Sequence, residues 1–127
     1  MDNESFRRWS HIAADWAADY RASIGERPVR VPLQPGAVLS QLAESPPDAA
    51  EPMDAIFRDF EDLIVPGMTH WQHPRFFAYF PANAAPVSVV AEYLVSAMAA
   101  QCMLWQTSPA ATELEIRVVD WLRQALG

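Results

Sequence analysis

Apolar residues recur at three- and four-residue steps through the first part of the chain, and charged residues fill the positions between them. One side of this segment is therefore apolar and the other is polar. The period predicts an amphipathic helix over about residues 4–24, with Gly25 placed to end it. A helix with this much aromatic surface must pack against another element. Its apolar face consists of Phe6, Trp9, Ile12, Ala13, Trp16, Tyr20 and Ile24.

The region after this helix contains prolines and then a second strongly periodic segment. Three prolines between positions 28 and 35 remove backbone donors and disfavour helix, so residues 26–35 are predicted to form an extended arm. We expect a short helix over 37–43 and a longer one over 52–64. The buried face predicted for the longer helix consists of Met53, Ile56, Phe57, Phe60, Leu63 and Ile64.

Two further helices are predicted toward the C-terminal end. Residues 86–103 carry charge only at Glu92, and a helix so apolar is expected to be buried on most of its surface. Ser108 followed by Pro109 is a typical helix start, which predicts the last helix over 109–126. The fold class predicted from these patterns is all-α, with about five helices and no internal repeat.

Residues 68–85 fit neither the helical nor the strand period, so we predict an irregular, aromatic-rich loop with a short extended piece over 76–80. Two interpretations of its rings are open. Rings such as Phe76 and Phe77 can fill the core between the flanking helices. Part of the loop can instead form an apolar wall for a flat aromatic ligand. The residues of that wall are Trp71, Tyr79, Phe80 and Pro81.

Composition and charge narrow the class of protein. With 127 residues, 51% of them apolar, the chain has the size of one ordinary domain. The net charge of −7 disfavours binding to nucleic acid or to an anionic membrane, because like charges repel. No apolar run approaches the roughly 18 residues of a membrane span, and signal-peptide features are absent, so we expect a cytoplasmic protein. Cys102 is the single cysteine and indicates neither an internal disulfide nor a metal site.

His70 and His73 have the spacing of some metal sites, but no third ligand or acidic motif accompanies them. We therefore predict no metal, and expect these side chains to make structural hydrogen bonds or ring contacts. The sequence has no glycine-rich phosphate loop and no recognisable spacing of serine, histidine and aspartate. No catalytic or cofactor-binding residue is predicted within the chain.

Two segments resemble the aromatic-L-amino-acid decarboxylase family, the group II pyridoxal-phosphate decarboxylases. They are PGMTHWQHPRFFAYFPANAAP (residues 66–86) and QTSPAATELEIRVVDWL (residues 106–122). The N-terminal helix, the proline-rich arm and the helix over 52–64 follow in the same order as in that family, so the resemblance spans essentially the whole chain. The combination of PANAAP with QCMLWQTSPAATELE is more similar to the bacterial members than to the animal ones.

The resemblance implies a fold-type-I homodimer with its active site at the dimer interface. It implies that residues 1–85 form an N-terminal helical dimerisation segment, and that residues 86–127 are the incomplete start of the large pyridoxal-phosphate domain. The chain then corresponds to the first part of a decarboxylase, giving dimer contacts and one wall of the substrate pocket. The expected partners are a second copy, or a chain carrying the missing large domain, and an aromatic L-amino acid. Nucleic acid and membrane are not expected partners.

The resemblance also implies a set of substrate-binding residues. The animal enzymes that act on catechols have a threonine where this chain has Ala82, so a donor to the ring hydroxyl is lost. Tryptophan, phenylalanine and tyrosine therefore all stay open as substrates. The positions that match the family's pocket are Trp71, Tyr79, Phe80, Pro81 and Ala82, together with Gln101 and Met103, which reach the pocket from the other subunit.

The chain contains no lysine, because all nine of its lysine-or-arginine positions are arginine. In the family, pyridoxal phosphate forms a Schiff base with a lysine of the large domain, where the other cofactor-binding groups also lie. We therefore expect pyridoxal 5'-phosphate in the complete enzyme, none held by this chain alone, and no catalysis by the isolated chain. Two other hypotheses stay open: a free-standing helical interaction or oligomerisation module from a truncated or split gene, and a binder of aromatic ligands without chemistry.

Overall fold

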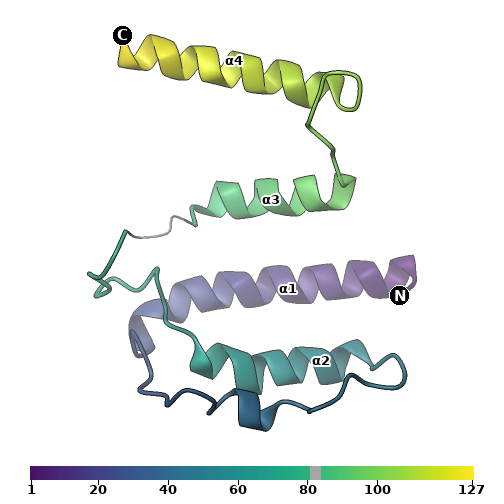
Figure 1. The fold of residues 1–127 in the computed structure, drawn as a ribbon, viewed down its shortest axis with the longest axis vertical. Coiled ribbons are helices and arrows are strands. Elements are labelled where there is room, and N and C mark those ends of the chain that lie inside the picture. Colours follow the sequence, from purple (N-terminus) through teal and green to yellow (C-terminus); the bar gives the residue numbers. More distant parts are fainter. Residues whose placement is uncertain (81–83) are drawn as a thin grey trace. The chain divides into compact units, whose positions relative to one another are not determined.

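Helices account for the regular structure of the described residues, as the all-α prediction requires. The computed structural model describes residues 1–80 and 84–127 (Figure 1). No strand occurs in these ranges, so the extended piece expected over 76–80 is absent from the described part of the loop. The chain divides into two compact units, unit 1 (Met1–Asn83) and unit 2 (Ala84–Gly127). The four α-helices of the described residues are α1 (Asn3–Ser23), α2 (Met53–Asp59), α3 (Pro86–Met98) and α4 (Pro109–Leu126).

α1 begins at a well-formed N-terminal cap. Oδ1 of Asp2 accepts a hydrogen bond from the Ser5 amide at 2.7 Å, and the Phe6 amide donates to the Asp2 carbonyl at 2.9 Å. The bond from the Ser5 amide lowers the pKa of the Asp2 carboxyl, because it stabilises the charged form. At its other end the helix tightens into a 3-10 turn, η1 (Ile24–Glu26). Gly25 directly follows the C-cap residue Ile24, as predicted, and lies inside that turn.

α2 continues into two helical turns with different hydrogen-bond spacing. The first is a π-helix, η3 (Phe60–Ile64), in which the Val65 amide donates to the Phe60 carbonyl. The second is a 3-10 turn, η4 (Val65–Gly67). Pro66 prevents a regular α-helix from continuing, because it has no amide proton and its ring clashes with the carbonyl four residues earlier. The helix predicted over 52–64 is present, with a change of spacing at Phe60.

α1 and the helical segment that starts with α2 run side by side in the same direction, and aromatic rings pack between them (Figure 1). The ring centroids of Trp9 and Phe57 lie 5.5 Å apart. Those of Trp16 and Phe60 lie 4.8 Å apart, edge to face. Residue numbers rise together in the two pairs, as parallel helices require. Each such pair contributes about 0.5–1.5 kcal/mol beyond the burial of its area.

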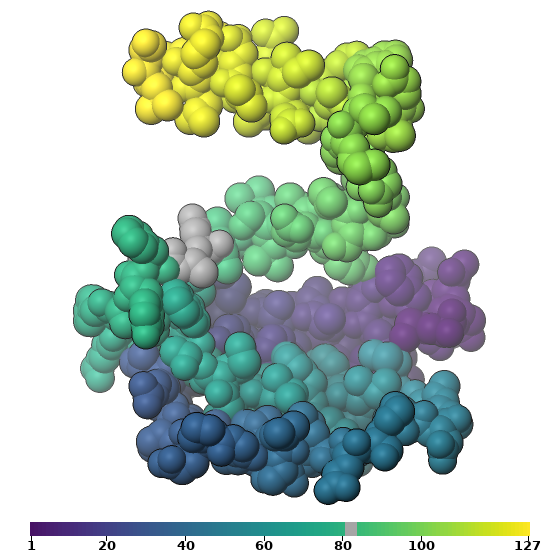
Figure 2. Space-filling model, viewed as in Figure 1, coloured from purple at the N-terminus to yellow at the C-terminus, as the bar shows by residue number. Residues whose placement is uncertain are grey.

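Residues 27–52 connect these parallel helices and run back along unit 1, where Figure 2 shows them in blue beside the teal of α2. This segment packs closely against η4, since a Cβ added to Gly67 would lie 3.1 Å from Cγ2 of Val38. In place of the helix expected over 37–43, it contains a 3-10 turn, η2 (Leu39–Gln41). So short a segment cannot offset the cost of helix nucleation by itself. Packing adds little support, because Leu39 is 73% exposed.

In unit 2, the apolar side chains of α3 and α4 lie largely on the surface. Val90 and Leu94 of α3 are 60% and 54% exposed, and Leu122 of α4 is 58% exposed. The helix predicted over 86–103 is therefore less buried than expected. It is also shorter than expected. α3 ends at Met98, because Ala99 adopts a left-handed conformation with φ 49° and ψ 40°.

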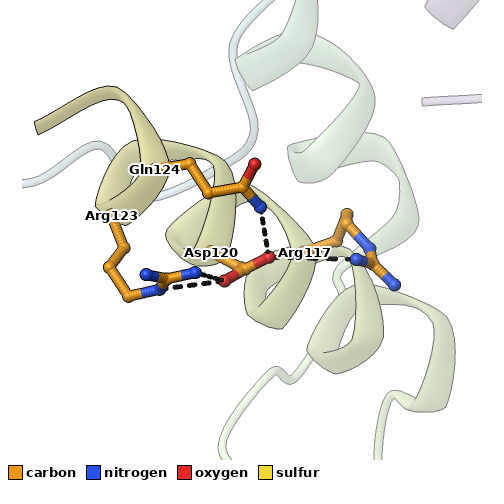
Figure 3. A network of polar contacts seen from close by, with 4 residues as sticks. All are labelled: Arg117, Asp120, Arg123 and Gln124. Carbon is orange, nitrogen blue, oxygen red and sulfur yellow. Dashed lines mark hydrogen bonds and ion pairs between the residues drawn. The ribbon is translucent and has the colours of Figure 1, made fainter. Parts of the chain in front are cut away.

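The polar side of α4 carries a network centred on Asp120 (Figure 3). Its Oδ1 accepts hydrogen bonds from Nε and Nη2 of Arg123 at 3.1 and 3.0 Å, and its Oδ2 accepts one from Nε2 of Gln124 at 2.8 Å. Nη1 of Arg117 lies 3.9 Å from Oδ2. The arginines are exposed, so water and salt screen these interactions and their contribution to stability is small. The network orders one face of a single helix, and α4 has the bounds predicted from the sequence.

Candidate functional site

The aromatic loop, defined here as residues 68–80, is held by two buried histidines. His70 is 3% exposed and His73 is 6% exposed. The His70 amide donates to the Val29 carbonyl at 2.9 Å. Two successive turns follow, in which the His73 amide donates to the His70 carbonyl and the Phe76 amide donates to the His73 carbonyl, each at 2.9 Å. Nδ1 of His73 also accepts from the Arg75 amide at 2.9 Å. Both imidazoles thus make structural contacts, in agreement with the interpretation favoured from the sequence.

A side-chain hydrogen bond joins this loop to α1. The Tyr20 hydroxyl and Nδ1 of His70 lie 2.7 Å apart, and their ring centroids are separated by 5.5 Å. Tyr20 is itself held on α1, because its ring stacks on Trp16 at 5.2 Å with an interplanar angle of 12°. The Arg27 guanidinium carbon lies 5.0 Å from the centroid of the Tyr20 ring, within cation–π range. No local sequence pattern indicated this contact, because its partners lie 50 positions apart.

The surroundings of His70 keep its imidazole neutral near pH 7. Burial lowers the pKa of His70 below its ordinary value of 6.5, and the positive charges of Arg27 and His73 lower it further. A neutral imidazole has one donor and one acceptor nitrogen. If the proton is on Nε2, Nδ1 accepts from the Tyr20 hydroxyl. If the proton is on Nδ1, that nitrogen donates to the Tyr20 oxygen instead, so the direction of the bond depends on the tautomer.

We expect the stability of unit 1 to fall as pH decreases below about 6.5, because His70 binds a proton more weakly in the folded state than in the unfolded state. The contribution of neutral His70 to the free energy of unfolding is fully present above the pKa that His70 has in the unfolded chain. It is lost as pH falls toward the lower pKa that His70 has in the folded chain. Thermal unfolding followed by circular dichroism between about pH 8 and pH 5 measures this dependence. His70→Asn removes the titrating group and should flatten the dependence of the unfolding temperature on pH in this range. An equal slope in that variant contradicts the assignment.

The second half of the loop brings aromatic rings together. The Trp71 ring lies 4.8 Å from Phe76 and 5.8 Å from Tyr79, with the Trp71 and Tyr79 planes inclined by only 26°. Tyr79 has a φ of 57°, in the left-handed region that bulky residues rarely adopt. Phe76 is partly buried, as the core interpretation predicts, whereas Phe77 is 90% exposed and does not fill the core. Trp71 and Tyr79 therefore form a stacked pair, the Trp71–Tyr79 pair, which is 39% and 86% exposed respectively.

The structure brings together only part of the predicted pocket. Trp71 and Tyr79 are in contact, and Phe80 follows them with 95% of its surface exposed. Gln101 and Met103 belong to unit 2, where the Gln101 carbonyl accepts from Oγ1 of Thr107 at 2.8 Å and Met103 is 80% exposed. Pro81 and Ala82 lie outside the described residues. Within residues 1–80 and 84–127, no group of three or more metal-ligating side chains is found.

None of the helices within residues 1–80 and 84–127 combines the length and the apolar character needed to cross a bilayer.

Known proteins share both the sequence and the fold of this chain. The pyridoxal-dependent decarboxylase conserved domain matches residues 35–127. Tyrosine decarboxylase from Oryza sativa subsp. japonica is 45% identical over 99% of this chain and 24% of its own length. Phenylacetaldehyde synthase from Arabidopsis thaliana is 41% identical over 100% of this chain and 26% of its own length. The crystal structure of Catharanthus roseus tryptophan decarboxylase in complex with L-tryptophan matches with a TM-score of 0.91 at 39% identity, over 98% of this chain and 27% of that one.

These relatives correct the expected similarity to bacterial members and confirm the resemblance to the decarboxylase family. They are plant proteins, so the expected closer similarity to bacterial members is not borne out. That expectation rested on two short motifs, which contain too few positions to place a chain within a branch of a family. The chain spans about a quarter of the length of the relatives that it matches, and corresponds to their N-terminal part. A domain match over residues 35–127, with relatives above 40% identity, shows that the chain belongs to the pyridoxal-dependent decarboxylase family.

Proposed function

We propose that this chain is the N-terminal part of a pyridoxal-phosphate-dependent aromatic L-amino acid decarboxylase, and that it supplies dimer contacts and one wall of the substrate pocket. The observation that carries the proposal is the exposed Trp71–Tyr79 pair, with ring centroids 5.8 Å apart, on a loop anchored by His70. A stacked pair of rings suits a flat aromatic side chain. Relatives named for tyrosine and tryptophan support this substrate class.

The covalent site for pyridoxal phosphate is proposed to lie outside these 127 residues. The chain has no lysine, and the α-amine of Met1 is its sole primary amine. Its residues therefore do not fit the covalent cofactor site of this family. The part played by this chain is to bind the aromatic side chain of the substrate, to orient it, and to keep water from that face of the pocket. The isolated chain is accordingly proposed to be inactive.

The proposal includes a homodimer and a division of the chain between two regions. Residues 1–85 are placed in the dimerisation segment, and residues 86–127 in the large domain. The exposed apolar side chains of α3 and α4 support a need for neighbours beyond this chain, because apolar surface of this extent is normally covered. Gln101 and Met103 are proposed to reach the pocket of the partner subunit. A cytoplasmic location completes the proposal.

A second activity is favoured by a specific observation, since two relatives are named for aldehyde formation. Phenylacetaldehyde synthases from Arabidopsis thaliana and Petunia hybrida are 41% and 43% identical to this chain. Tryptophan decarboxylase 2 of Oryza sativa subsp. japonica and tryptophan decarboxylase TDC1 of Camptotheca acuminata are each 41% identical, so identity over this region does not separate the two activities. Product analysis does separate them, because a decarboxylase yields an amine and an aldehyde synthase yields an aldehyde.

A chimera tests the proposed wall. This chain replaces the matching N-terminal part of the rice tyrosine decarboxylase, and kcat and KM are measured for tyrosine, tryptophan and phenylalanine. We expect Trp71→Ala or Tyr79→Ala to lower kcat/KM about fivefold, because one well-placed ring contact contributes about 1 kcal/mol to substrate binding. Phe77→Ala is the control, since it removes from the same loop a ring that is about as exposed as that of Tyr79.

The outcomes of this test are distinct. A selective loss with Trp71→Ala and Tyr79→Ala supports the wall, and the preferred amino acid then identifies the substrate. Equal losses with Phe77→Ala indicate a general disturbance of the loop and contradict the assignment of the pair. An inactive chimera whose fold is intact contradicts the assignment of this chain to an aromatic amino acid decarboxylase.

A further inference from the structure

Tyr20 is the point at which α1 reaches the aromatic loop. Its ring lies in contact with Trp16 on one side, at 5.2 Å, and with the Arg27 guanidinium carbon, at 5.0 Å. Trp16 is in turn fixed by its edge-to-face contact with Phe60 at 4.8 Å. A ring constrained by neighbours in this way has little rotational freedom. The Tyr20 hydroxyl is therefore presented in a defined direction, toward His70.

His70 binds the Tyr20 hydroxyl and thereby fixes the position of the aromatic loop. Its imidazole is 3% exposed and bonds to the Tyr20 hydroxyl at 2.7 Å, while its amide donates to the Val29 carbonyl at 2.9 Å. One side-chain bond and one backbone bond thus fix the residue that directly precedes Trp71. Rotation of the His70 side chain away from Tyr20 would leave a buried polar nitrogen without its partner, which is energetically costly.

The far end of the loop lacks a comparable anchor among the contacts described. Tyr79 is 86% exposed, and its φ of 57° is a conformation that persists only when surrounding contacts hold it. Its ring contact is the stack on Trp71 at 5.8 Å. The arrangement of the Trp71–Tyr79 pair therefore depends on Trp71. The position of Trp71 depends on His70, which directly precedes it, and on its ring contact with Phe76 at 4.8 Å.

We propose that the hydrogen bond between Tyr20 and His70 is a positioning device that sets the angle at which the Trp71–Tyr79 pair faces its aromatic ligand. Tyr20 and His70 act through the pair and touch no substrate themselves, so they are positioning residues. The consequence for catalysis rests on the proposed function, whereas the consequence for the geometry of the two rings does not. The device has two testable parts, the contact between the rings and the binding of substrate.

The first measurement uses the 127-residue chain and follows the nuclear Overhauser cross-peak between the Trp71 and Tyr79 rings. Tyr20→Phe removes only a hydroxyl. In this variant we expect the ratio of molecules with the Trp71 and Tyr79 rings in contact to molecules with the rings apart to fall about fivefold. The cross-peak should weaken to match. His70→Ala should behave alike, and His70→Asn, which keeps a polar atom near the position of Nδ1, should retain most of the signal. Tyr93→Phe is the control, because it removes a hydroxyl from a tyrosine of α3 that is 48% exposed.

A cross-peak between Trp16 and Phe60, measured in the same spectra, reports whether unit 1 stays folded. Selective loss of the Trp71–Tyr79 cross-peak supports the proposal. Retention of that cross-peak in Tyr20→Phe overturns it. Loss of both cross-peaks together also overturns it, because the bond would then serve the fold as a whole.

The second measurement uses the rice chimera described above. In Tyr20→Phe we expect kcat/KM to fall about fivefold. The fall should come from a higher KM, with kcat nearly unchanged, because misplaced rings weaken substrate binding. A purely structural role would reduce the amount of active enzyme, which lowers the apparent kcat and leaves KM unaltered. That result overturns the proposal. If the unsubstituted chimera is folded but inactive, the proposed function fails, and the ring cross-peak alone decides whether the positioning device exists.

Discussion

The 127-residue chain by itself is expected to release no carbon dioxide from tyrosine, tryptophan or phenylalanine, and to acquire no specifically attached pyridoxal phosphate. Covalent attachment of this cofactor needs a primary amine, and all nine lysine-or-arginine positions are arginine. A guanidinium stays protonated at neutral pH and does not replace the amine. The expected result is a complete loss of activity relative to the rice chimera. Release of labelled carbon dioxide from carboxyl-labelled amino acids measures it directly.

The α-amine of Met1 requires a separate control, because it is the one primary amine that could react with the aldehyde. Borohydride reduction followed by peptide mass analysis locates any attached cofactor, and an N-terminally acetylated chain removes the amine. Attachment confined to Met1, without turnover, is the expected background. Turnover by the isolated chain that survives acetylation would contradict the proposal that the cofactor is held elsewhere.

The same chain is expected to self-associate at micromolar concentration and to sediment as species heavier than its 14.2 kDa monomer. The reason is the apolar surface of unit 2, because contiguous patches of this kind are rarely left exposed by soluble monomers. Trp121 and Leu122 are both 58% exposed. The exposed apolar side chains of α4 are Leu114, Ile116, Val118, Val119, Trp121, Leu122 and Leu126.

A pair of charged substitutions tests whether this face causes the association. Val118→Glu with Leu122→Glu, one helical turn apart, should return most of the material to monomer in sedimentation velocity. Gln34→Glu with Gln106→Glu adds the same charge at exposed positions elsewhere and should leave association unchanged. Circular dichroism confirms that α4 is still helical. If the unsubstituted chain is already a monomer, both the expected association and the hypothesis of a free-standing oligomerisation module are wrong.

Local sequence patterns predicted most of the helices, because those patterns involve residues within a few positions of one another. The span of α1 follows from the spacing of Trp9, Trp16 and Tyr20, and that of α4 from its start at Ser108 and Pro109. The extent of α3 was overestimated, since its apolar sequence continues past Ala99, whose left-handed conformation ends the helix. A change of backbone conformation at one alanine leaves no pattern in the neighbouring residues.

The site was less predictable than the helices, because it depends on contacts between distant segments. The aromatic loop suggested Trp71 and Tyr79 as part of an apolar wall, and the resemblance to a known family gave the same positions. Nothing in the local spacing indicated that their rings stack. The bond from Tyr20 to His70 crosses 50 positions, and a tyrosine on an amphipathic helix is equally compatible with simple core packing. His70 could be interpreted from sequence only as a residue that makes some hydrogen bond. Its partner required the three-dimensional structure.

The shared direction of α1 and α2 constrains how this region can change in evolution or in engineering. A chain that leaves the end of one helix and enters the start of a parallel neighbour must travel back along the whole first helix. For the 21 residues of α1 that distance is about 30 Å, which takes roughly ten extended residues. Residues 27–52 exceed that minimum, so partial deletions that spare Arg27, Val29 and Val38 should be tolerated. Replacement by a tight turn would reverse the polarity of α2 and separate Trp16 from Phe60.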